Sequence, residues 1–340
     1  MSRGAGAPII LAADVGGTKT QLGLFRADTG TLEPLRVETV PSDPALSFVE
    51  VLGRFLHPSD TARPAAACLA VAGPVVAQRV TMTNHPWVLD ASELSGALAG
   101  IPVRIVNDLE ATAVAMPHLP ASRLVAVAGP TEHARRGNIA VVAPGTGLGC
   151  ASLYWDGTRH HPVASEGGHG DFAPRDDREI ALWHFLHERH GHVSWERILS
   201  GPGIVALYTF VRDVVGLPES APVRARFATA PDPAAVVSHA ALDDEDPLSG
   251  AALDLFARVL GAKAGNLALE IMAVGGVFIA GGIAPKVLPA LTRGSLREAF
   301  LDKGRQRALL ERLPIHVSLE SDAPLLGAAR LAHGTASTSV

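Results

Sequence analysis

The feature that most constrains the fold is an internal repeat at half-chain spacing. Residues 9–25, "IILAADVGGTKTQLGLF", consist of an apolar strand, a Gly/Thr turn and a second apolar strand. Residues 139–154, "IAVVAPGTGLGCASLY", repeat that plan. Two such units in one chain predict a duplicated domain. Each turn offers backbone N–H groups and a threonine hydroxyl to an anion, although a single turn of this kind is also compatible with an ordinary hairpin.

Between and after these units, short apolar runs alternate with longer amphipathic ones, which is typical of an α/β protein. The expected strands are 8–13, 20–25, 66–72, 103–106, 138–143, 149–154 and 276–280. The expected helices are 44–56, 109–117, 177–190, 203–215, 247–273 and 322–333. The Gly and Ala residues of 247–273 predict close packing of that helix against a neighbouring backbone. Residues 217–247 are rich in Pro, Ala and Asp and are expected to form a loop with room for one short helix.

Length and charge narrow the class of protein. A chain of 340 residues is long enough for two domains. Its net charge of −5 gives no electrostatic reason to expect a nucleic acid or a membrane as partner. The two cysteines, Cys68 and Cys150, lie in apolar strand-like runs and indicate a reducing compartment. The first apolar run stops at Asp14, too short for a signal peptide or a membrane span, so we expect a cytoplasmic protein.

The segment "IVNDLEATAVAM", 105–116, places two polar residues where a strand ends and a helix begins. Asp108 has two interpretations there. It could cap the helix, or it could act at the carboxyl end of a strand, where open α/β sheets bind ligands. A kinase that phosphorylates an alcohol needs a carboxylate to accept the hydroxyl proton. Asn107 could bind a polyol through its amide.

The loop "SEGGHGDF", 165–172, brings Glu166, His169 and Asp171 close together in sequence. A metal site is one interpretation, but the spacing fits no zinc pattern and no cysteine or second histidine completes a ligand set. A polar turn without function is another. Sugar binding is the third, because hydroxyls both donate and accept hydrogen bonds and suit carboxylate and imidazole groups.

Two further segments carry candidate ligands. In "GHVSWERILSGPG", 191–203, Ser194 resembles a helix N-cap, which would place Glu196 in the first turn, either as a ligand or as a charge that stabilises the helix. In "GGVFIAGGIAPKVL", 275–288, a buried strand runs into Gly281 and Gly282, which would let a nucleotide base or ribose lie against bare backbone.

Taken together, these segments resemble the bacterial ATP-dependent glucokinases of the non-ROK type, in the actin/hexokinase/Hsp70 superfamily. The resemblance extends from "DVGGTKT" to "LLGAARLA", nearly the whole chain. The segments that carry it are "AGPVVAQRVTMTNHPW" (72–87), "VNDLEA", "PGTGLG", "SEGGHGDFAP", "GHVSWERILSGPG" and "GGVFIAGGI".

The resemblance implies a role for each matching position. Asp108 becomes the general base for the sugar 6-hydroxyl, and Asn107 binds the adjacent part of the ring. The remaining hydroxyls are bound by Glu166, His169 and Glu196. The nucleotide phosphates are bound by two loops, which consist of Ala13, Asp14, Val15, Gly16, Gly17 and Thr18, and of Gly145 and Thr146. Gly281 and Gly282 form the adenosine site, and Asp14 also serves Mg²⁺ through water.

The same resemblance implies a two-lobed, actin-like (ribonuclease H-like) α/β fold with duplicated mixed-sheet domains and a cleft between the lobes. The small domain would comprise 1–118 with 320–340, and the large domain 119–319. The expected substrates are glucose and ATP with Mg²⁺, without structural zinc, and the expected assembly is a homodimer.

Three alternatives remain at this point. The first is phosphorylation of another hexose. The second is a sugar-responsive regulator without turnover, although too few residues precede Asp14 for an N-terminal helix-turn-helix. The third is an Hsp70-type ATPase, which the sugar-like cluster and the missing peptide-binding domain disfavour.

Overall fold

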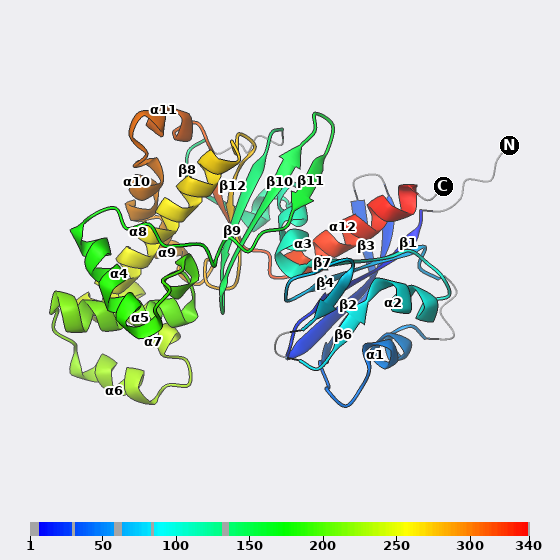
Figure 1. Ribbon diagram of the computed structural model, residues 1–340, viewed down its shortest axis with the longest axis horizontal. Coiled ribbons are helices and arrows are strands. Elements are labelled where there is room, and N and C mark those ends of the chain that lie inside the picture. Colours follow the sequence, from blue (N-terminus) through cyan, green and yellow to red (C-terminus); the bar gives the residue numbers. More distant parts are fainter. Residues whose placement is uncertain (1–6, 29–30, 58–62, 83–84, 131–135, 339–340) are drawn as a thin grey trace. The chain divides into compact units, whose positions relative to one another are not determined.

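The computed structural model describes residues 7–28, 31–57, 63–82, 85–130 and 136–338. The chain divides into two compact units, one built from Met1–His118 with Ser321–Val340 and the other from Leu119–Glu320. Each unit contains a mixed β-sheet with helices packed against it (Figure 1). The predicted α/β class is therefore confirmed.

The first unit contains a five-stranded sheet with the order β3-β2-β1-β4-β7. Its strands are β1 (Ile9–Val15), β2 (Lys19–Asp28), β3 (Thr31–Pro41), β4 (Ala66–Val71) and β7 (Val103–Asn107). The first three are antiparallel neighbours, whereas β1, β4 and β7 run parallel. A separate two-stranded sheet is formed by β5 (Arg79–Thr81) and β6 (Val88–Asp90). The helices are α1 (Phe48–Phe55), α2 (Ala91–Ala97), α3 (Asp108–Ala115), the 3₁₀ turn η1 (Met116–His118) and α12 (Ala323–Thr338).

Strand β1 is apolar apart from Asp14 because both faces of this sheet are covered. Leu11 and Ala13 lie in a core cluster with Phe48 of α1, and Ile10 and Ala12 lie in a second cluster with residues of α3 and α12. Successive side chains on a strand point to opposite faces. Asp14 therefore shares a face with Ala12, toward α3 and α12.

The second unit contains a six-stranded sheet with the order β11-β10-β9-β12-β13-β8. Its strands are β8 (Leu124–Ala128), β9 (Ile139–Pro144), β10 (Leu148–Trp155), β11 (His160–Val163), β12 (Gly276–Ile279) and β13 (Ile315–Ser318). Strands β11, β10 and β9 are antiparallel neighbours, and β9, β12 and β13 run parallel. This is the same pattern as β3-β2-β1-β4-β7, with β8 added antiparallel to β13. The two repeated segments of the sequence form the antiparallel pairs β1–β2 and β9–β10.

Helices pack against one face of this second sheet, and α8 (yellow in Figure 1) lies among them. The longer helices are α4 (Asp177–His190), α5 (Gly201–Phe210), α6 (Ala221–Thr229), α7 (Pro233–Leu242), α8 (Pro247–Glu270) and α10 (Ser295–Leu301). The shorter helical segments are η2 (Ala121–Arg123), η3 (Trp195–Arg197), η4 (Val211–Val215), α9 (Leu288–Leu291), η5 (Gly304–Gln306) and α11 (Arg307–Leu310).

The predicted close packing of the Gly-rich helix is confirmed at Gly261 of α8. A Cβ atom added there would lie 2.0 Å from the carbonyl oxygen of Leu296 in α10. No side chain fits at that distance, so glycine lets the two helices touch through their backbones.

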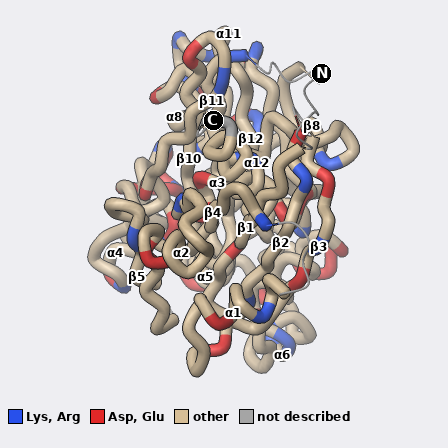
Figure 2. The backbone as a smooth tube through the Cα atoms, turned by 90° about the vertical axis from the view of Figure 1, so that its right-hand side faces the viewer, with Lys and Arg blue, Asp and Glu red and all other residues tan. Residues whose placement is uncertain are grey.

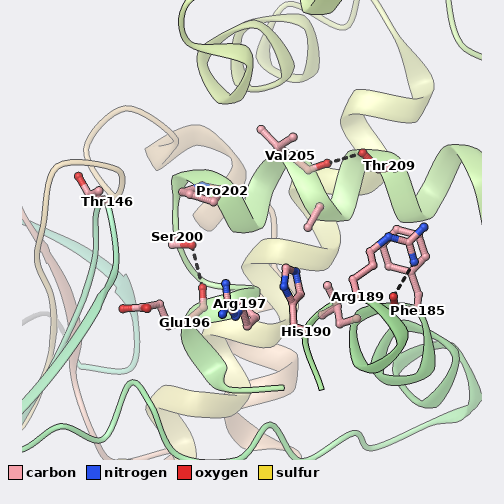
Figure 3. A pocket seen from close by; sticks show the side chains of 12 residues that line it. Thr146, Phe185, Arg189, His190, Glu196, Arg197, Ser200, Pro202, Val205 and Thr209 are labelled. Carbon is pink, nitrogen blue, oxygen red and sulfur yellow. Dashed lines mark hydrogen bonds between the residues drawn. The ribbon is translucent and has the colours of Figure 1, made fainter. Parts of the chain in front are cut away.

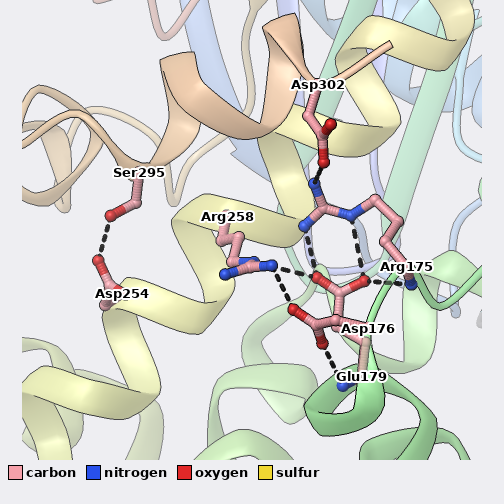
Figure 4. Close-up of polar contacts among 7 residues, drawn as sticks. All are labelled: Arg175, Asp176, Glu179, Asp254, Arg258, Ser295 and Asp302. Carbon is pink, nitrogen blue, oxygen red and sulfur yellow. Dashed lines mark hydrogen bonds and ion pairs between the residues drawn. The ribbon is translucent and has the colours of Figure 1, made fainter. Parts of the chain in front are cut away.

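A buried charge cluster joins the start of α4 to α8 (Figure 4). The Glu179 carboxylate, whose side chain is 1% exposed, accepts hydrogen bonds from the guanidinium groups of Arg175 and Arg258. Arg258 also binds Asp176, which caps α4 by accepting from the Glu179 N–H. Because a buried carboxylate needs compensating donors, this cluster fixes the segment that follows the "SEGGHGDF" loop.

One expectation about local structure was wrong, and another, the Ser194 cap with Glu196 in the first turn, is confirmed in position only. Residues 217–247 contain two helices, α6 and α7, and α7 begins with an Asp232 cap followed by Pro233 at the first helical position. Ser194 occupies the position before the 3₁₀ turn η3, but its side chain makes no capping hydrogen bond, and the next α-helix, α5, is capped by Ser200.

Charged residues of both signs are interspersed along the described chain (Figure 2). Among the helices that the structure describes, none combines the length and the apolar composition that a bilayer-spanning segment needs.

Candidate active site

The first glycine turn connects β1 to β2 in the first unit. The Gly16 N–H donates to the Lys19 carbonyl at 3.1 Å, which closes a tight turn over Gly17 and Thr18. Ala13 and Val15 are buried in the strand before it, whereas Thr18 is exposed. The turn therefore presents its backbone at the carboxyl end of β1.

Asn107 and Asp108 lie at the same edge of the sheet as this turn. Val15 is in register with Val71, and Val71 with Asn107, so the parallel strands β1, β4 and β7 end at one level. Adjacent strands are about 4.8 Å apart, which separates the ends of β1 and β7 by about 10 Å. The glycine turn and the Asn-Asp pair are therefore neighbours within this unit.

The helix cap at this point is Asn107, and Asp108 is the first residue of α3. The Asn107 Oδ1 accepts from the Leu109 N–H at 2.9 Å, and its Nδ2 donates to the Gly73 carbonyl at 3.0 Å. Asn107 is thus the N-cap residue of α3, and the Asp108 Oδ1 also accepts from the Leu109 N–H at 2.8 Å. The amide of Asn107 keeps one N–H and one lone pair for a ligand.

The electrostatics of this edge are set by carboxylates. The pKa of Asp14 is raised from 3.8 to about 6, chiefly by burial and then by the negative charge of Asp108, with a smaller contribution from Asp322; Lys19 partly offsets these effects. Burial and nearby negative charges both destabilise the ionised carboxylate, so a cation bound beside it would stabilise that form.

The second unit brings three of the predicted sugar-binding residues together. The His169 ring lies between two carboxylates: its Nε2 is 4.0 Å from Glu166 Oε2, and its Nδ1 is 3.8 Å from Glu196 Oε1. The side chains of Glu166 and His169 are 62% and 60% exposed, so both can reach a ligand from solvent.

Backbone hydrogen bonds hold this loop in place. The His169 N–H donates to the Glu166 carbonyl at 3.0 Å, and the Glu196 N–H donates to the Gly168 carbonyl at 3.0 Å. A Cβ atom at 168 would lie 1.9 Å from the Leu148 carbonyl oxygen, so the loop approaches β10 closely only because residue 168 is glycine. The glycines of "SEGGHGDF" thus bring the acidic and imidazole groups onto the second glycine turn.

Glu196 also contacts that turn directly. Its Oε2 accepts from the Leu148 N–H at 2.9 Å. The turn is closed by a hydrogen bond from the Gly145 N–H to the Gly147 carbonyl at 2.8 Å, and the Gly201 N–H at the start of α5 donates to the Gly145 carbonyl at 2.9 Å. Gly145 and Thr146 therefore lie between the predicted sugar ligands and the start of α5.

Gly281 and Gly282 follow β12 on the other side of the same turn. The Ile283 N–H donates to the Pro144 carbonyl at 3.2 Å, directly before Gly145. Gly281 has φ +80°, and a Cβ atom there would lie 2.5 Å from the Pro144 carbonyl oxygen. A Cβ atom at Gly282 would meet nothing within 4 Å, so that backbone is open to a ligand.

A pocket of 290 Å³ lies beside Glu196 in the second unit (Figure 3). Thr146 and Glu196 lie at one end of the pocket, and Arg189 lies at the other. Burial and the positive charges of Arg197 and Arg189 lower the pKa of His190 in its wall. Sequence reasoning missed these basic residues; Arg189 and His190 end α4, where cations are favoured. It also missed Asp322, one residue before α12.

No group of three or more His, Cys, Asp or Glu side chains suited to direct metal coordination occurs among the described residues. Asp14, with its raised pKa, still fits a hard divalent cation. Mg²⁺ is commonly bound through one or two carboxylates, with water and substrate phosphates completing its shell.

The fold is similar to that of sugar kinases of known structure. Glucokinase from an Antarctic psychrotroph has a TM-score of 0.85 and is 34% identical over 96% of this chain and 99% of that one. Glucokinase from Balamuthia mandrillaris, solved in complex with glucose, has a TM-score of 0.79 and is 25% identical over 98% and 95%.

Sequence comparison identifies the family. The family model described as Glucokinase matches residues 11–335. A glucokinase of Trichormus variabilis is 38% identical over 94% of this chain and 98% of that protein, and one of Synechocystis is 37% identical over 94% and 96%. The chain belongs to the glucokinase family.

Proposed function

We propose that this protein transfers the γ-phosphoryl group of ATP to the 6-hydroxyl of glucose, giving glucose 6-phosphate and ADP. The observation that carries the proposal is the position of His169 between Glu166 and Glu196, on a loop that packs against a glycine turn of phosphate-binding type. Carboxylates and an imidazole suit the hydroxyls of a sugar. The adjacent turn suits the phosphates of a nucleotide.

The sugar ligands come from both units in this proposal. Glu166, His169 and Glu196 bind the ring hydroxyls, and Asn107 binds the part of the ring next to the reacting group. Asp108 accepts the proton of the 6-hydroxyl as its oxygen attacks phosphorus. Its position at the end of a parallel strand, beside the first glycine turn, supports this assignment.

The nucleotide is bound by three backbone segments. Ala13 to Thr18 form the first phosphate loop, Gly145 and Thr146 form the second, and Gly281 with Gly282 contact the adenosine. The hydrogen bonds that join Pro144, Gly145, Gly201 and Ile283 support a common site for the second loop and the adenosine segment.

Mg²⁺ bound near Asp14 would neutralise the charge of the phosphates. The position of Asp14 near the end of β1 and its raised pKa support this role, because a cation would compensate the negative charge there. We assign no structural zinc.

The architecture we propose is the two-lobed actin-like (ribonuclease H-like) fold. Residues 1–118 with 320–340 form the small domain, and 119–319 the large one. The identical order of five strands in both sheets supports a duplication.

We also propose that the enzyme is a cytoplasmic homodimer. Both cysteines are buried in strands with their thiols free, a state that a reducing compartment preserves. Light scattering of the purified protein tests the dimer.

A coupled assay tests the reaction. Formation of glucose 6-phosphate should require ATP and stop when EDTA removes the divalent cation. A panel of mannose, fructose and N-acetylated sugars at equal concentration measures preference. Absence of ATP-dependent phosphorylation of any hexose at millimolar concentrations would reject the proposal.

A further inference from the structure

The segment "AGPVVAQRVTMTNHPW" has no role in the proposed reaction, yet its end is firmly anchored in the first unit. The His85 ring is buried and lies against Trp87, with ring centroids 4.2 Å apart. The Trp87 Nε1 donates to the Leu46 carbonyl at 2.6 Å, and the ring packs edge-on against Phe48. These contacts fix residues 42–48, which follow β3.

Ser42 in that segment directs its hydrogen-bonding groups to the first glycine turn. Its N–H donates to the Thr18 carbonyl at 3.0 Å, and its hydroxyl donates to the Gly16 carbonyl at 2.7 Å. Because that hydroxyl has one hydrogen, the contact of 2.9 Å between its oxygen and Thr20 Oγ1 must use the hydrogen of Thr20. Ser42 is 7% exposed, so these bonds are shielded from water.

His85 completes this arrangement from the other side. Its Nε2 lies 3.2 Å from the Ser42 carbonyl oxygen, which can only accept, so Nε2 carries the proton. The Nδ1 atom of the same ring is buried and has no hydrogen-bond partner among the described residues.

The geometry of the peptide bond links these contacts to the direction of the N–H groups in the turn. In a trans peptide, the C=O of one residue and the N–H of the next point in opposite directions. Holding the carbonyls of Gly16 and Thr18 toward Ser42 therefore turns the N–H groups of Gly17 and Lys19 away from it. An anion binds to N–H groups and is repelled by carbonyl oxygens.

We propose that Ser42 and His85 are positioning residues for the first phosphate loop. Ser42 holds two carbonyl dipoles away from the nucleotide phosphates so that the N–H groups of the turn face them, and His85 holds Ser42. This inference rests on the proposed role of residues 14–18 in binding phosphate.

The test compares Ser42→Ala with Ser47→Ala. Ser47 lies on the same segment and caps α1 through a capping box with Glu50, but it does not contact the turn. Both substitutions should lower the midpoint of thermal unfolding. Ser42→Ala alone should raise the KM for ATP by about five- to tenfold, because the loss of about one hydrogen bond that orients the loop weakens nucleotide binding by that factor. The Kd for glucose, measured by calorimetry without ATP, should stay within about twofold of the wild-type value.

A second variant covers the case in which Ser42→Ala does not fold. His85→Phe keeps an aromatic ring against Trp87 but removes the donor to Ser42, and it should raise the KM for ATP in the same direction by a smaller factor. Unchanged KM for ATP in a folded Ser42→Ala, or in His85→Phe if that alone folds, would overturn the inference. A wild-type protein that does not use ATP would instead reject the proposed function.

Discussion

At the scale of single residues, Asp108 has two interpretations, of which the local sequence favours helix capping. A polar residue between a strand and a helix is expected to cap the helix, and here that position belongs to Asn107. The sequence could not show which of the two adjacent residues is the N-cap, because this depends on where the backbone changes from extended to helical. In the structure that change follows Asn107. The proposal that Asp108 acts as a general base can therefore be tested separately from helix capping.

Asp108→Asn should therefore lower kcat by about 10²–10⁴-fold, the usual contribution of a general base. The amide keeps the shape of the side chain and can still bond to the hydroxyl, so the Kd for glucose should change much less. A 100-fold loss corresponds to about 2.7 kcal/mol of activation free energy. Initial rates and calorimetry on the same preparation measure both quantities, and turnover near the wild-type level would refute the base assignment.

Asp14 should lower the stability of the metal-free protein at neutral pH. Its pKa is raised in the folded state from 3.8 to about 6. Below pH 3.8 both states hold the proton and there is no effect. As pH rises toward 6 the unfolded chain releases its proton first, so the folded state loses stability, by about 3 kcal/mol above pH 6.

Asp14→Asn should accordingly stabilise the protein in EDTA at pH 8 and abolish phosphorylation. At pH 5 the gain should shrink to about half. Urea unfolding of both proteins at the two pH values measures the difference. An equal gain at both values would indicate that charge is not the cause.

At the scale of elements, the sequence predicted most of the strands and long helices because their periodicity is strong. Both repeated strand pairs, the parallel strands β4 and β7, and helices α4 and α8 lie where the apolar runs place them. Helices α6 and α7 were missed because a segment rich in proline and aspartate is typical of a loop. The Asp232-Pro233 pair was the available signal, since proline favours the first position of a helix.

Contacts between elements were less predictable than the elements. The Ala- and Gly-rich pattern indicated that α8 packs closely against some backbone, but only the structure shows that Gly261 meets Leu296 of α10. The same limit applies to Glu179, whose two arginine partners lie 4 and 79 residues away. The local sequence pattern does not predict which residue from a distant part of the chain contacts a given side chain.

Two glycines of α8 provide a matched test of that contact. Gly261→Ala should destabilise the protein by about 1–3 kcal/mol, because the added methyl group meets a carbonyl oxygen and the helices must separate. A Cβ atom at Gly250 would meet nothing within 4 Å, so Gly250→Ala should stabilise the same helix by up to about 1 kcal/mol. Urea unfolding of the two variants should give opposite signs; the same sign for both would contradict the close-contact argument.

At the scale of the whole molecule, the predicted site residues form two groups, one in each unit. Glu166, His169, Glu196, Gly145, Thr146, Gly281 and Gly282 belong to the second unit, and Ala13 to Thr18, Asn107 and Asp108 belong to the first. A single glucose can contact Asp108 and His169 together only if both units contribute to one site. Sugar binding would then stabilise the arrangement in which both units contact the sugar, and this arrangement would exclude water from the γ-phosphate.

Glucose should therefore make the protein more compact in solution. The radius of gyration from small-angle scattering should fall on saturation with glucose in the absence of ATP. His169→Ala, which removes the imidazole between Glu166 and Glu196, should show no such change at the same glucose concentration, although its radius without sugar should equal that of the wild type. If the wild-type radius stays constant while calorimetry shows that glucose is bound, the sugar site lies within an arrangement of units that is already closed, and the proposed movement is wrong.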